Sequence, residues 1–146
     1  MTEILLSDDL ARLDIARIHG WLASSYWSPG IERELVERAI RESHCLGAYR
    51  GDAQVGFARM ITDHATFAWL ADVWVDEVVR GQGIGKRMVA WFLDHPRFQG
   101  IRRFALATRD AHDVYASQGF TPLLRPDRYM ERLTPGFADL LRTHQA

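Results

Sequence analysis

The chain has 146 residues, of which 47% are hydrophobic and 25% are charged, so we expect one globular domain over residues 1–146. Its net charge of -1 shows no basic excess, which argues against a nucleic-acid binder, and its one cysteine, Cys45, favours a reducing cytoplasmic location. No apolar run reaches the roughly 18–20 residues that a membrane span needs. The first residues also lack the basic region of a signal peptide.

The first third of the chain alternates between strand-like and helix-like patterns. Residues 2–6 form a short apolar run that is expected to open the fold as a strand. Apolar residues at helical spacing predict helices over residues 14–25 and 31–41, the second with charged residues along its other side. The break between these helices contains two adjacent aromatic residues, Tyr26 and Trp27.

Three strands are predicted in the middle of the chain, over residues 45–49, 55–61 and 66–75. Short polar turns separate them, which indicates an antiparallel meander. The third strand is apolar on both of its faces, a pattern typical of a strand in the middle of a sheet. Asp72 is the one charged residue inside it.

A glycine-rich turn over residues 80–85 leads into a helix that begins near Ile84 and ends at His95-Pro96. Beyond it we expect strands over residues 104–107, 121–124 and 129–133, and helices over residues 111–118 and 135–143. These elements predict an α+β fold, with a mixed, mostly antiparallel sheet of about six to seven strands flanked by about four helices.

Three phosphate-binding patterns compete for the glycine turn. A Walker A loop needs glycine where Arg80 stands and serine or threonine where Arg87 stands, so it fits poorly. A Rossmann turn needs G-x-G-x-x-G in a parallel unit, which is absent here. The pattern Q/R-x-x-G-x-G/A is satisfied by Arg80, Gly83 and Gly85, and it aims backbone N–H groups and a helix dipole at a pyrophosphate. The alternative is a turn that only packs a helix tightly on a sheet.

Three motifs carry a family resemblance: LADVWV at residues 70–75, RGQGIGK at residues 80–86 and DAHDVYASQGF at residues 110–120. In this order and at this separation, they resemble the GNAT N-acetyltransferase superfamily. The resemblance implies a single GNAT-like acetyltransferase domain, with acetyl-CoA as the acyl donor and a small-molecule or peptide amine as the acceptor. It also implies a homodimer.

The resemblance also implies a role for each motif. The end of the central strand would offer backbone groups to the pantetheine arm and the thioester, and the glycine turn would bind the pyrophosphate. Tyr115 would act as the general acid for the departing thiolate. Tyr26 and Trp27 would overhang the acceptor. The implied cofactor-binding residues are Val73, Trp74, Val75, Arg80, Gly81, Gln82, Gly83, Ile84, Gly85, Lys86 and Tyr115.

The sequence offers several candidates for the general base. Asp72 is the first candidate for this catalytic role, and the alternative is a buried acid satisfied by an arginine or by the backbone. His64 and His112 are weaker candidates. Many family members carry asparagine seven residues before the tyrosine, whereas this chain has Thr108, which counts against a cofactor contact from that position.

Two further alternatives share these motifs. A non-catalytic acyl-CoA binding or sensing module on the same fold would keep the glycine turn without needing Tyr115, and an enzyme using a longer acyl-CoA would keep every motif. No histidine pair has metalloprotease spacing and there is no cysteine pair, so no metal site is expected. Polyamines, amino acids, antibiotics and protein amino groups all remain open as acceptors.

Overall fold

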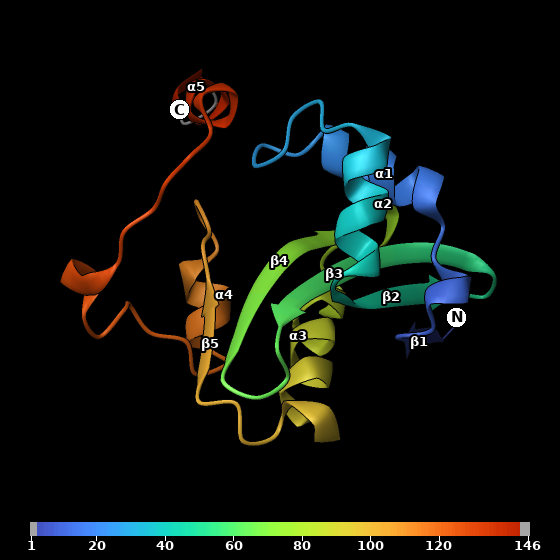
Figure 1. Ribbon diagram of the computed structural model, residues 1–146. Coiled ribbons are helices and arrows are strands. Elements are labelled where there is room, and N and C mark those ends of the chain that lie inside the picture. The colour runs from blue at the N-terminus through green and yellow to red at the C-terminus, as the bar shows by residue number, and fades with distance from the viewer. Residues whose placement is uncertain (1–2, 144–146) are drawn as a thin grey trace.

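The computed structural model describes residues 3–143 and contains a five-stranded sheet with helices on both faces (Figure 1). The strands lie across the sheet in chain order: β1 (Ile4–Ser7), β2 (His44–Arg50), β3 (Ala53–Thr62), β4 (Phe67–Val75) and β5 (Arg103–Leu106). Neighbouring strands are antiparallel except β4 and β5, which are parallel. The predicted α+β fold with a mixed, mostly antiparallel sheet is confirmed.

Each face of the sheet buries its own hydrophobic cluster. Helix α3 (Ile84–Asp94) packs Met88 and Phe92 against the face that carries Leu46 and Met60. Helices α1 (Ile15–Ala23) and α2 (Arg33–Arg41) cover the opposite face, where Phe57 is fully buried (Figure 1). Among residues 3–143, no helix is long and apolar enough to cross a membrane.

The C-terminal third differs most from the sequence prediction. Helices α4 (His112–Ala116) and α5 (Pro135–Thr143) form as expected. The strands predicted over residues 121–124 and 129–133 do not form, so the sheet of the described chain has five strands rather than six or seven. Pro122 lacks a backbone N–H for a strand ladder, and Leu124 and Met130 are 93% and 97% exposed, so no buried face holds these segments in register.

The parallel pair β4 and β5 forms a V. Its register runs from Phe67 opposite Arg103 to Leu70 opposite Leu106, where β5 ends while β4 continues to Val75. Figure 1 shows β4 curving away from β5 and from the chain that follows β5. The edge of β4 that faces β5 therefore has no strand partner beyond Leu70 within the described chain.

Candidate active site

A cavity of about 590 Å³ lies where β4 and β5 separate. It is lined by Leu70 to Val73 of β4 and by Leu106 to Thr108 at the end of β5. The α1–α2 loop and α5 lie beyond the open end of the V (Figure 1), and both contribute side chains to the cavity wall. Five of the residues proposed from sequence line this one cavity: Tyr26, Trp27, Asp72, Val73 and Tyr115.

A bulge in β4 decides how Asp72 is placed. Asp72 and Val73 lie together opposite the single residue Ala58, and Asp72 has a φ of 58°. Asp and Asn adopt this left-handed conformation more readily than most residues other than glycine. The bulge lets Val73 and Val75 face α3 while Asp72 faces the side covered by the α1–α2 loop.

Both carboxylate oxygens of Asp72 accept hydrogen bonds. Arg59 Nε donates to Oδ2 over 2.8 Å, and Trp27 Nε1 donates to Oδ1 over 2.9 Å. Arg59 also donates from Nη1 to Ser43 Oγ over 3.0 Å. The side chains of Arg59 and Asp72 are only 16% and 10% exposed, so this is a largely buried ion pair at the cavity wall.

Sequence reasoning missed Arg59 and the contribution of α5. Arg59 is the one charged residue within the apolar run of residues 55–61, and that contrast was the available signal. Phe137 and Leu141 of α5 are four residues apart, so they share a helical face, and both line the cavity. The sequence pattern offered no reason to bring this terminal helix to the site.

The α1–α2 loop is tied to the segment between β5 and α4. Tyr26 Oη accepts a hydrogen bond of 3.0 Å from the backbone N–H of Arg109, and the Arg109 guanidinium lies 4.0 Å from the centre of the Tyr26 ring. The rings of Trp27 and Trp74 lie 6.0 Å apart. These contacts fix the Tyr26 and Trp27 side chains at the cavity wall, and their predicted role over an acceptor stays a prediction.

Tyr115 lies on α4, with its ring centre 5.9 Å from that of Phe120. Burial raises the pKa of the Tyr115 hydroxyl, and the nearby Tyr26 adds to the increase. Thr108 Oγ1 accepts a hydrogen bond of 3.1 Å from Ala111 N just before α4 begins. The residue that departs from the family pattern therefore holds the start of the helix that carries Tyr115.

The glycine turn has the backbone conformation that its sequence requires. Gly81 and Gly83 have φ angles of 82° and 76°, and Gly83 is the N-terminal cap of α3. Arg80 Nε donates to the carbonyl of Val75 over 2.9 Å, which ties the turn to the end of β4. The first backbone N–H groups of α3 have no partner within the helix, so this end favours an anion.

The remaining candidates fall outside this cavity. Trp74 and Val75 lie at the end of β4 and the turn residues at the start of α3, next to the cavity, and their cofactor-binding role stays a prediction. His112 is exposed at the start of α4, and His64 lies in the β3–β4 turn against His44. A larger hollow of about 660 Å³ along β5 and residues 118–129 contains none of the residues proposed for chemistry.

The comparisons with known proteins match this geometry. A sequence model of the acetyltransferase (GNAT) family matches residues 12–120. The chain belongs to the GNAT family. It is 31% identical over 138 residues to a protein of Gibberella zeae that is named as an acetyltransferase, covering 77% of this chain and 76% of that protein. The GNAT resemblance inferred from sequence is therefore confirmed.

Solved structures support the same membership. A GNAT-family protein from Xanthomonas campestris pv. campestris is 47% identical, with a TM-score of 0.89 over 93% of this chain and 96% of that chain. A predicted acetyltransferase from Clostridium acetobutylicum, solved with acetyl-CoA, shares the fold at 17% identity, with a TM-score of 0.65 over 91% and 96% of the two chains. As a GNAT enzyme, the protein is an N-acetyltransferase with acyl-CoA as its cosubstrate.

Proposed function

We propose that this GNAT enzyme transfers an acetyl group directly from the acetyl-CoA thioester to a primary amine held in the cavity between β4 and β5. The observation that carries the proposal is the convergence of Tyr26, Trp27, Asp72 and Tyr115 on this one cavity, beside the unpaired edge of β4. The pyrophosphate would bind at Gly83 and Gly85, and the pantetheine arm would lie along Val73 to Val75.

The cavity combines aromatic walls with the carboxylates of Asp72 and Asp110, and the Asp72 carboxylate is paired with Arg59. Tyr26, Trp27 and Trp69 supply ring faces, and Asp72 supplies negative charge. Aromatic faces and carboxylates both attract an organic ammonium group. Asp72 would attract the ammonium of the acceptor and take up its proton, directly or through a water molecule, while Arg59 and Trp27 hold the carboxylate in place.

The transfer then proceeds in one attack. The amine nitrogen forms a bond to the thioester carbon, and a backbone N–H of β4 stabilises the developing oxyanion, a contribution of about 2.7–4 kcal/mol for such donors. The C–S bond breaks as the carbonyl re-forms, and the thiolate takes its proton from the Tyr115 hydroxyl. The second proton, which the attacking nitrogen loses as the amide forms, returns to the Tyr115 oxygen directly or through a water molecule. The raised pKa of Tyr115 keeps that hydroxyl protonated at neutral pH, as a general acid must be.

Release of free thiol from acetyl-CoA, measured across a panel of amines and peptides, tests this proposal. The panel contains polyamines, aromatic amines, amino acids and lysine peptides, and calorimetry on the same samples verifies acetyl-CoA binding. Thiol release that depends on a primary amine supports acetyl transfer to that amine. Binding of acetyl-CoA with no turnover across the panel contradicts the proposal and favours a non-catalytic acyl-CoA-binding module.

A further inference from the structure

Four polar side chains meet near the end of α3, and none of them lines the cavity between β4 and β5. Asp8 follows β1, His44 begins β2, His64 lies in the β3–β4 turn and His95 follows α3. The sequence predicted no metal site because no histidine pair has a short metal-binding spacing. The fold brings these distant residues together, so spacing along the chain does not reveal the cluster.

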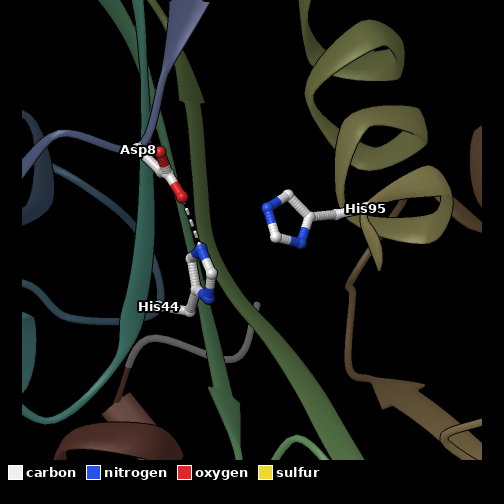
Figure 2. A group of neighbouring side chains, drawn as sticks. All are labelled: Asp8, His44 and His95. Atoms are coloured by element: carbon white, nitrogen blue, oxygen red, sulfur yellow. Dashed lines mark hydrogen bonds and ion pairs between the residues drawn. The ribbon is translucent and has the colours of Figure 1, made fainter. Parts of the chain in front are cut away.

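Three of these side chains present ligand atoms to one another. The ligand atoms of Asp8, His44 and His95 all lie within 4.8 Å of one another, and His44 Nε2 is 2.9 Å from Asp8 Oδ2 (Figure 2). Nδ1 of His95 accepts a hydrogen bond of 3.1 Å from the backbone N–H of Arg97. The other ring nitrogen of His95, Nε2, therefore remains to face Asp8 and His44, as Figure 2 shows.

His64 occupies the position of an outer partner to this group. Its Nε2 lies 2.8 Å from Nδ1 of His44. Metal-bound histidines commonly donate their second ring N–H to a neighbouring acceptor, which fixes the tautomer and the ring orientation.

The surrounding packing holds the His44 ring in place. Its side chain is 10% exposed, with ring centres 5.9 Å from Phe92 and 5.1 Å from Phe98. The adjacent Cys45 points to the other face of the sheet, into the hydrophobic cluster under α1 and α2. Its Sγ donates a hydrogen bond to the carbonyl of Ile40, so the thiol does not face Asp8, His44 and His95. Asp8 is exposed, which leaves a path for an ion to enter.

The charges around the group favour a cation on balance. Asp8 contributes a carboxylate, and the C-terminal end of α3, an 11-residue helix capped by His95, carries partial negative charge. Arg97 lies near enough to His64 to oppose a cation. Two imidazoles and a carboxylate match the protein ligands of three-ligand zinc sites.

We propose that Asp8, His44 and His95 bind a divalent transition-metal ion of the zinc class, with His64 orienting His44 as an outer partner. Zinc bonds of about 2.0–2.2 Å place tetrahedral ligand atoms roughly 3.3 Å apart. The pair of His44 and Asp8 is already close to that spacing, and the His95 ring closes the site by moving toward them. A bound ion would link the segment after β1 to β2 and to the end of α3.

Calorimetric titration with ZnCl₂ tests this site on the untagged chain of 146 residues after treatment with a chelator. We expect one saturable site per chain, and binding should be at least about tenfold weaker in Asp8→Asn and in His95→Gln. His64→Phe should also weaken binding, because His44 loses its outer partner. His112→Gln, a change at an exposed histidine outside the cluster, should bind zinc as the unchanged protein does.

Thermal unfolding gives a second readout that separates binding from misfolding. Zinc should raise the Tm of the unchanged protein and of His112→Gln, and should raise it much less in Asp8→Asn. Circular dichroism verifies that each variant is folded. Absence of saturable binding, or equal zinc affinity in the unchanged protein and in folded Asp8→Asn and His95→Gln, would overturn the proposal.

Discussion

Trp27 and Asp72, 45 residues apart in the chain, are joined by a hydrogen bond of 2.9 Å from the indole Nε1 to Oδ1. The second oxygen of Asp72 accepts from Arg59 on β3. One carboxylate thus connects the α1–α2 loop to the bulge of β4 and to the neighbouring strand. Because Trp27 and Asp72 both line the cavity, this contact fixes the loop against the cavity wall.

Replacing Trp27 with phenylalanine should weaken acceptor binding and leave acetyl-CoA binding unchanged. An aromatic ring remains, but the hydrogen bond from the indole to the charged Asp72 carboxylate is lost. Hydrogen bonds to charged groups contribute about 1.5–3 kcal/mol. Steady-state kinetics should therefore show a raised KM for the amine. Trp21→Phe on α1, outside the cavity lining, is the matched control, and an equal rise in KM there would contradict a specific role for Trp27.

Replacing Tyr115 with phenylalanine should lower kcat by about 10²–10⁴, the usual contribution of general acid–base catalysis, with little change in the affinity for acetyl-CoA. A general acid works only while protonated, so the raised pKa of Tyr115 should extend activity to more alkaline pH than an ordinary tyrosine would allow. The kcat–pH profile measures this. Tyr129→Phe, at a residue outside the cavity lining, should leave kcat unchanged, and an unaltered kcat in Tyr115→Phe would refute the assignment.

The two glycines that begin α3 should respond differently to alanine. Gly83 has a φ of 76°, so Gly83→Ala should lower the free energy of unfolding by about 1–2 kcal/mol and weaken acetyl-CoA binding. A Cβ at Gly85 would meet Val75 Cγ2 at 3.6 Å, an ordinary contact, so Gly85→Ala should keep its stability. Urea unfolding compares the two variants. Equal losses of unfolding free energy in the two variants would show that the positive φ angle is not what requires glycine at position 83.

The Cys45 thiol should be unreactive in the folded protein. Burial raises its pKa to about 12, so almost no thiolate forms at pH 8. A chromogenic disulfide reagent should label Cys45 slowly under native conditions and rapidly in denaturant. Native labelling at the rate of a free cysteine would mean that the α1–α2 face opens far more readily than its packing indicates.

Asp63 should make the protein lose stability as the pH falls into the acid range. Its carboxylate accepts hydrogen bonds from Thr66 and from the backbone of the β3–β4 turn, which lower its pKa well below the ordinary value. A lowered folded-state pKa stabilises the fold above the unfolded-state pKa of about 3.9, and this contribution disappears as the pH falls below it.

Asp63→Asn should therefore flatten the acid side of a plot of unfolding free energy against pH. Asp52→Asn, in the exposed β2–β3 turn, provides the control and should leave the slope unchanged. The same slope in Asp63→Asn and the unchanged protein would show that other carboxylates dominate the acid response.

Much of the core could be predicted from local pattern. The helical spacing of apolar residues in α3 matches one period because one face of that helix is buried, and the apolar runs of β2 and β3 match strands that are buried on both faces of the sheet. Residues 121–124 and 129–133 show the opposite case. They carry strand-like composition, but Leu124 and Met130 remain exposed, and composition does not reveal whether a neighbouring edge is available for pairing.

The sequence by itself determined the family, the glycine turn and the aromatic pair in the α1–α2 break, because these depend on residue types at short, fixed spacing. Only the tertiary structure decided that Arg59 pairs with Asp72, that α5 reaches the cavity, and that Asp8, His44 and His95 meet. Each of these contacts joins residues of different elements, and the bulge in β4 places Asp72. The packing of the whole sheet, rather than any local sequence pattern, places those features.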